Sequence, residues 1–119
     1  MRYLLLIYGD ESVYANMSEE ELKADLDKWW EYDAALKEAG ASPGGEALQP
    51  TATATSVRAG ENGNPLVSDG PFAETREQLG GYYLLDVENL DEAIKWANRC
   101  PGVKHGTIEL RPIQEFEQG

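Results

Sequence analysis

The chain has 119 residues, of which 41% are hydrophobic and 27% are charged, a balance typical of one folded domain with one core. Its formal net charge is −12 and it has no cluster of Lys and Arg, so we expect neither nucleic-acid binding nor docking on anionic membranes. No apolar run approaches the roughly 18 residues of a membrane span, residues 1–8 lack a signal-peptide cleavage site, and one cysteine suits a reducing compartment. We therefore expect a single cytoplasmic domain over residues 1–119.

The first third of the chain predicts a buried strand followed by a long helix. Residues 2–8 are apolar at consecutive positions and end at Gly9, which favours a buried strand. Ser18 and Glu21 form a capping box, which predicts a helix start, and Gly40 is a typical residue just past a helix end. Apolar side chains recur on one face of this helix, at Leu22, Leu26, Trp29, Tyr32 or Asp33, and Leu36.

The middle of the chain predicts a strand pair. Residues 42–46 are rich in turn-forming residues. Residues 51–58 alternate small apolar with β-branched polar positions, as a half-exposed strand does, and residues 65–68 can return after the turn at 60–64. A long connection over residues 69–81 follows.

The last third predicts a strand, a helix and a strand. Residues 82–87 form the strand, Asn89 and Glu92 cap the helix, Pro101 stops it, and residues 106–113 alternate as a strand. The predicted inward face of the helix consists of Leu90, Ala93, Ile94, Ala97 and Cys100. The complete order is βαββαβ with extra β structure in the middle. This order predicts an α+β, ferredoxin-like sheet with two helices on one face.

Both faces of the central sheet are predicted to be apolar. Residues 4–7 and 82–85 are apolar or aromatic at every position, and consecutive side chains of a strand point to opposite faces. Two helices cover only one face, so we expect a homodimer packed sheet against sheet to cover the other. The alternative is that the connection over residues 69–81 folds under the sheet.

Residues 69–87, which begin Asp-Gly-Pro-Phe, resemble the DGPF motif of the YCII-related family. Supporting matches lie at residues 1–9, 44–48, 89–94, 100–101 and 109–112. The resemblance implies a dimeric α/β-barrel arrangement, but it implies no settled biochemistry. Many members are encoded beside sigma factors of the extracytoplasmic-function type. Shorter relatives carry a proposed His–Asp pair with the His on the first helix. That place falls near Trp29 here, where the chain has no His, and Asp69 is the candidate for the Asp, so the resemblance does not carry the pair over intact.

Asp69 and His105 are the candidate catalytic residues. Asp69 could act as a general acid or base if burial raises its pKa, although Asp-Gly-Pro is also a turn former in its own right. His105 is the only histidine, and it could relay protons with Asp69 or Glu46 or simply be a solvated loop residue.

Trp29, Arg76 and Tyr82 are the candidate ligand-binding residues. Trp29 and Tyr82 could line an apolar cavity or belong to the core, and Arg76 could hold an anion or pair with a carboxylate of the protein. We expect Cys100 to be a buried structural thiol, and with one His and one Cys we expect no metal site and no cofactor.

Two classes of function remain open. One is a small-molecule-binding or regulatory domain, linked to a sigma-factor system as the resemblance suggests. The other is a small cofactor-independent enzyme, such as a lyase, an isomerase or a monooxygenase-like protein, in which Asp69 and His105 transfer protons. An Asp69 buried in a closed pocket would favour the enzyme, whereas a solvated Asp69 would favour the binding domain.

Overall fold

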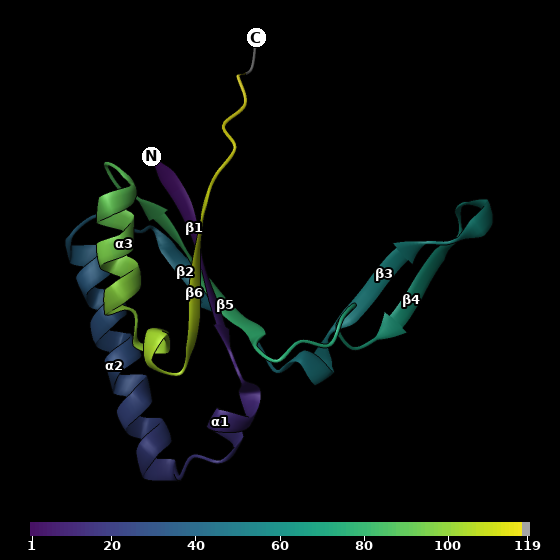
Figure 1. Ribbon diagram of the computed structural model, residues 1–119, viewed down its shortest axis with the longest axis horizontal. Coiled ribbons are helices and arrows are strands. Elements are labelled where there is room, and N and C mark those ends of the chain that lie inside the picture. Colours follow the sequence, from purple (N-terminus) through teal and green to yellow (C-terminus); the bar gives the residue numbers. More distant parts are fainter. Residues whose placement is uncertain (118–119) are drawn as a thin grey trace.

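The computed structural model describes residues 1–117 as a four-stranded antiparallel sheet with helices on one face and a two-stranded arm projecting from it (Figure 1). The sheet has the strand order β2-β5-β1-β6, with every neighbouring pair antiparallel. Its strands are β1 (Arg2–Gly9), β2 (Gly44–Ala47), β5 (Gln78–Asp86) and β6 (Gly106–Pro112). This is the ferredoxin-like order, so the predicted α+β fold class is confirmed.

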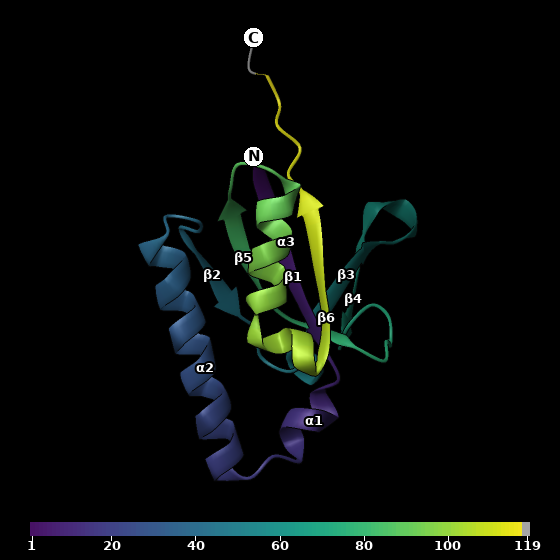
Figure 2. The same cartoon turned by 60° about the vertical axis from the view of Figure 1, so that its left-hand side comes forward.

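Two long helices cover one face of the sheet (Figure 2). They are α2 (Glu19–Glu38) and α3 (Leu90–Arg99). A short helix α1 (Glu11–Ala15) follows β1, and single 3₁₀ turns occur at η1 (Thr51–Thr53), η2 (Glu61–Gly63) and η3 (Pro101–Lys104). Within residues 1–117, none of the helices combines the length and the apolar character that crossing a bilayer requires.

The helix boundaries follow the capping signals in the sequence. The Ser18 hydroxyl accepts a hydrogen bond from the Glu21 amide at 3.1 Å, and the Glu21 carboxylate accepts one from the Ser18 amide at 3.2 Å. Asn89 accepts from the Glu92 amide at 3.0 Å at the start of α3. Gly40 adopts φ 66° beyond the end of α2, in the left-handed region that favours glycine. Both predicted helix starts are confirmed.

The core lies between the sheet and the two long helices. Tyr3 and Leu5 of β1 and Leu85 of β5 point toward the helices and are buried, together with Leu36 of α2. The buried positions of α3 are Ala93 and Trp96, and Cys100, the residue that caps the helix at its C-terminal end, is buried on the same side. The predicted inward face was therefore wrong at Leu90 and Ile94, each 50% exposed. Because Trp96 occupies the space over the sheet, these two side chains are turned away from it.

The second face of the sheet has an apolar centre, as predicted, and charged side chains such as Glu46, Glu109 and Arg111 flank it on the edge strands. Leu4 pairs with Leu84 and Leu6 pairs with Tyr82, and these four side chains are half-buried on the side opposite the core. The helices lie on the other side. Residues 71–76 are exposed and do not cover this face, so the alternative in which the 69–81 connection folds under the sheet is not what the chain adopts.

The strand assignment in the middle of the chain needs correction. Gly44–Ala47, predicted as a turn, is the edge strand β2. A Cβ atom built on Gly45 would overlap the Tyr82 carbonyl of β5, so this glycine permits close strand packing rather than a turn. The predicted strand pair instead becomes β3 (Thr55–Ala59) and β4 (Pro65–Asp69), which bond only to each other and form the arm (Figure 1).

Candidate functional site

A cavity of about 810 Å³ lies at the end of the sheet where β1 finishes and β5 begins. It is bounded by α2, by α1, by the strand ends and by residues 45–50. The volume is within the roughly 300–1,000 Å³ range of small-molecule sites. Its lining is mostly apolar, and its aromatic members are Tyr8, Tyr14, Trp29, Trp30, Tyr82 and Tyr83.

The Trp29 side chain is held in place on α2. Its indole Nε1 donates to Asp25 Oδ2 at 3.2 Å, one helical turn earlier. Its ring meets the ring of Tyr32 edge-on, with 6.3 Å between the centroids, and Tyr32 meets Tyr83 edge-on at 5.6 Å. The far end of the indole packs on Gly102, where an added Cβ would lie 3.4 Å away. This aromatic wall is therefore preformed rather than assembled by a ligand.

Two carboxylates in the lining are engaged in internal contacts. Glu11 accepts from the Thr51 amide at 2.9 Å, which ties α1 to the segment beyond β2. Asp33 pairs with Lys37 at 2.8 Å on the surface of α2. Burial, followed by the nearby Asp33 carboxylate, raises the pKa of Tyr83 to about 12, so this phenol stays neutral and can only donate or accept hydrogen bonds near neutral pH.

Glu46 and His105 are two polar side chains of the lining that lack an internal partner. Within residues 1–117, neither side chain forms a hydrogen bond or an ion pair. Glu46 lies on β2 and is exposed, and His105 follows η3 and is also exposed. Both contribute to the lining of the cavity, so they are available to a ligand's polar end.

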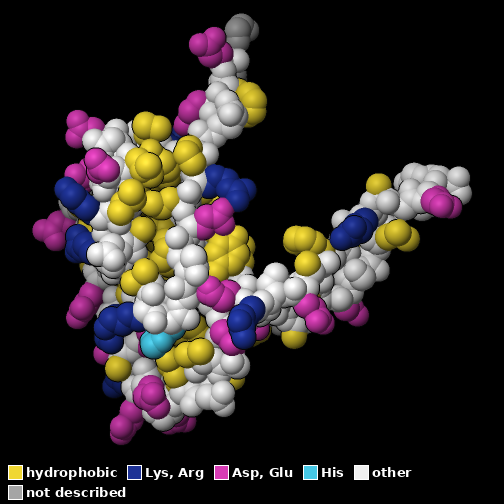
Figure 3. Space-filling view, in the orientation of Figure 1, with side chains coloured by type: hydrophobic (Ala, Val, Ile, Leu, Met, Phe, Trp, Pro, Cys, Tyr) yellow, Lys and Arg dark blue, Asp and Glu magenta, His cyan; other side chains and the backbone are white. Residues whose placement is uncertain are grey.

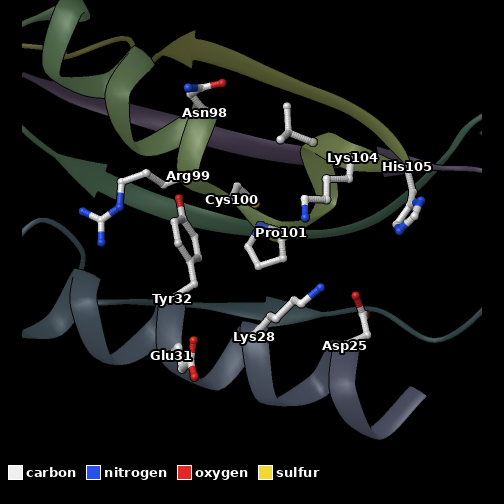
Figure 4. A pocket seen from close by; sticks show the side chains of 11 residues that line it. Asp25, Lys28, Glu31, Tyr32, Asn98, Arg99, Cys100, Pro101, Lys104 and His105 are labelled. Atoms are coloured by element: carbon white, nitrogen blue, oxygen red, sulfur yellow. The ribbon is translucent and has the colours of Figure 1, made fainter. Parts of the chain in front are cut away.

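A second, smaller cavity of about 300 Å³ lies between α2 and the α3–η3 junction (Figure 4). Lys28 reaches into it from α2 and Lys104 from η3, and His105 lies in the lining of both cavities. Arg99 stacks on the Trp96 ring with 4.4 Å to the centroid. Burial raises the pKa of the Cys100 thiol at the bottom to about 11, so this cysteine stays protonated and is not an activated nucleophile.

The structure brings together three of the five predicted site residues. Trp29, Tyr82 and His105 line the larger cavity, and the strand register places the Tyr82 side chain on the second face of the sheet, beside Leu6. Asp69 and Arg76 line neither cavity. Asp69 is exposed at the base of the arm, opposite Thr55 in the β3–β4 ladder, and Arg76 is exposed in the loop before β5.

Several lining residues were absent from the predicted set. Tyr8 lies next to the end of the first strand, and Tyr14 lies on the short helix α1. An aromatic residue at the end of an apolar strand was a usable signal for Tyr8. Nothing in the local pattern indicated the helix that positions Tyr14. Among residues 1–117, no group of three or more His, Cys, Asp or Glu side chains is arranged to hold a metal ion.

Residues 1–117 match the YCII-related domain. The chain is 38% identical over 123 residues to an uncharacterised protein, R00369, from Rhizobium meliloti (strain 1021), covering all of this chain and 97% of that protein. A solved structure with a similar chain path is 5-chloro-2-hydroxyhydroquinone dehydrochlorinase (TftG) from Burkholderia phenoliruptrix AC1100, in complex with 2,5-dihydroxybenzoquinone. Its TM-score is 0.48 and its sequence identity is 12%, with 100% of this chain and 96% of that chain covered.

Proposed function

We propose that this chain, which belongs to the YCII-related domain family, is a small-molecule-binding domain whose ligand is a compact, largely apolar organic molecule. The observation that carries the proposal is the cavity of about 810 Å³ with its preformed aromatic wall. Trp29 and Tyr83 present rigid faces and edges on which a flat ring can pack. Such a site gains affinity by removing apolar ligand surface from water.

The charges around the cavity favour a neutral ligand. Glu11, Asp33 and Glu46 lie in its lining, and no Lys or Arg does. The whole chain adds a net charge of −12. An anionic ligand would meet repulsion from each of these groups, so a neutral aromatic or phenolic molecule fits better than a carboxylate of the same shape.

The position of Asp69 favours binding over catalysis. Asp69 is exposed on the arm and lies outside both cavities, whereas His105 lies at their shared border. A proton relay between these two residues would require a second chain to bring its Asp69 to the site. Within one chain, His105 is the one of the two candidate proton-transfer residues that lines the cavity. The enzyme therefore stands as the second candidate.

We also propose that the chain forms a homodimer. Leu4, Leu6, Tyr82 and Leu84 present an apolar second face that neither the helices nor residues 71–76 cover. A second copy is the simplest cover for such a face. A cytoplasmic location and a link to sigma-factor systems stay predictions from the sequence and the family resemblance.

Calorimetric titration tests the ligand class. The probes are 2-naphthol, which is neutral, and 2-naphthoate, which has the same ring system with a carboxylate. We expect saturable binding of 2-naphthol and binding of 2-naphthoate that is weaker by about tenfold or more, equivalent to about 1.4 kcal/mol.

A matched pair of variants locates the binding. Ala47→Phe places a ring in the lining of the cavity, whereas Ala73→Phe adds the same ring to the exposed loop outside it. Ala47→Phe is expected to weaken 2-naphthol binding by about tenfold or more, and Ala73→Phe to leave it unchanged. Equal affinities in the two variants, or no saturable heat with 2-naphthol at all, would contradict the proposal.

A further inference from the structure

The β3–β4 arm has one apolar face. In its ladder Val57 pairs with Val67 and Ala59 pairs with Pro65, so these four side chains share one side of the hairpin. The opposite side carries Ser56, Arg58, Leu66 and Ser68. Asp69, at the base of β4 and opposite Thr55, lies on the same side as the valines and is the one charged residue of that face.

This apolar face is uncovered in the single chain. Val57 is 63% exposed and Val67 is 64% exposed. The arm projects away from the sheet and its helices, and its hydrophobic side chains stand free along it (Figures 1 and 3). An isolated two-stranded hairpin is marginally stable in water, so an arm of this kind requires a surface to pack on.

A second copy of the chain is the partner that the two uncovered apolar surfaces favour, because the apolar face of the arm and that of the sheet can cover each other between copies. Each copy carries a net charge of −12, so an interface between two copies must exclude most of the acidic groups. The apolar face of the arm meets this requirement, because Asp69 is its single charged residue. The second face of the sheet has an apolar centre of Leu4, Leu6, Tyr82 and Leu84.

The combined surface approaches the size of a stable interface. The apolar side of the arm adds Thr55, Val57, Ala59, Pro65, Val67 and Asp69 to the second face of the sheet. Together they supply about 19 residues, close to the lower end of the roughly 20–30 that specific interfaces use from each partner. The sheet face alone falls well short of that range. In a twofold dimer both arms would make this contact, so the interface would contain it twice.

We propose that the arm is a clasp that packs its Val57–Val67 face on the second copy of the chain. This inference rests on the homodimer proposed above and adds that the contact of the arm stabilises that dimer. Since Asp69 lies on the packed face, the clasp also carries this carboxylate to the partner's surface. That placement accounts for an Asp69 that lies outside both cavities of its own chain.

Two adjacent substitutions on opposite faces of β4 test the clasp. Val67→Glu places a charge on the apolar face, and Leu66→Glu, the control, places the same charge on the other face opposite Arg58. The two side chains are similarly exposed, at 64% and 60%. Light scattering coupled to size exclusion at micromolar concentration should show a dimer for the wild type and for Leu66→Glu. For Val67→Glu we expect the dimer dissociation constant to rise by about 100-fold or more, leaving a monomer of 13.2 kDa.

Hydrogen exchange supplies a second measurement that does not depend on a variant. The backbone amides of residues 55–69 should exchange more slowly as the wild-type concentration is raised through the dimer dissociation constant. Exchange in the arm that is independent of concentration would overturn the clasp. Circular dichroism of Val67→Glu should match the wild type, because the arm shares no strand pairing with the sheet.

The outcomes separate the clasp from the proposals on which it rests. A wild-type monomer would overturn both the homodimer and the clasp. A dimer that persists in Val67→Glu would overturn the clasp and leave the homodimer standing. Failure of 2-naphthol to bind would overturn the ligand proposal alone, because the light-scattering result does not depend on a ligand.

Discussion

Tyr32 links the two long helices through a single buried hydrogen bond. Its hydroxyl donates to the Trp96 carbonyl at 2.7 Å, in the last turn of α3, where backbone carbonyls lack partners within the helix. Tyr32 is only 4% exposed, and burial raises the pKa of its phenol far above the ordinary value. The substitution Tyr32→Phe would remove this hydroxyl and keep the ring with its edge contacts to Trp29, Tyr83 and Trp96.

The expected loss of stability in Tyr32→Phe follows from the Trp96 carbonyl, which would lose its hydrogen-bond donor. A buried acceptor that loses its donor costs about 1–3 kcal/mol, because water cannot replace the lost partner. For a domain of this length, each kcal/mol corresponds to a fall in melting temperature of roughly 4 °C, so we expect a decrease of about 4–12 °C. Urea denaturation followed by circular dichroism measures the same change in free energy, with an unchanged m-value.

The control for Tyr32→Phe is Tyr14→Phe. The Tyr14 hydroxyl makes no hydrogen bond within residues 1–117, so its removal is expected to change the free energy of unfolding by less than about 0.5 kcal/mol. If Tyr32→Phe also stayed within about 0.5 kcal/mol of the wild type, the reasoning about the α3 carbonyl would be refuted.

Two further predictions concern the core and the sheet. Burial raises the pKa of Cys100 from 9.0 to about 11, so the unfolded thiol ionises first and stability should fall as the pH rises from about 9 to 11. Urea midpoints measured across that range should fall less steeply in Cys100→Ala, and an identical slope would contradict the assignment. A Cβ on Gly106 would overlap the Tyr8 carbonyl of β1, so Gly106→Ala should cost roughly 3 kcal/mol. Gly80→Ala, where the nearest atom would lie 3.8 Å away, should be tolerated, and melting temperatures compare the two.

The parts of the fold that the sequence could predict are those whose signals are local. The capping box of Ser18 and Glu21 and the cap at Asn89 fix where the two long helices begin through backbone groups a few residues away. The apolar runs of β1 and β5 likewise identified a sheet with two apolar faces. These contacts or patterns lie within a single element, so one segment of sequence is enough to indicate them.

The parts that could not be predicted depend on contacts between distant segments. The glycine at position 45 looks like a turn residue until β5 is known to pass close beside it. The sequence named Trp29, Tyr82 and His105 as candidates, but it could not predict that they line the same cavity. They come from three separate elements, which only the folded chain brings together. Asp69 and Arg76 were also candidates, but they lie away from the cavity. The alternation of residues within a hairpin predicts its strands and does not predict in which direction the hairpin projects from the sheet.

The base of the arm is closed by its own hydrogen bonds. The Gly70 amide donates to the Ala54 carbonyl at 2.7 Å, and the Ser56 hydroxyl donates to the Gly70 carbonyl at 2.8 Å. The chain therefore enters the arm and leaves it at nearly the same point. A change in the length of the segment between Ala54 and Gly70 therefore need not move the rest of the protein.

Because of this closed base, the arm can change in evolution separately from the cavity. Residues could be inserted into the arm or removed from it in cross-strand pairs, which would preserve its register, without moving Trp29 or any other wall of the cavity. The assembly of the protein and the chemistry of its pocket can thus diversify independently. Lineages that inherit one pocket are free to acquire different quaternary architectures by lengthening, shortening or trimming a single loop.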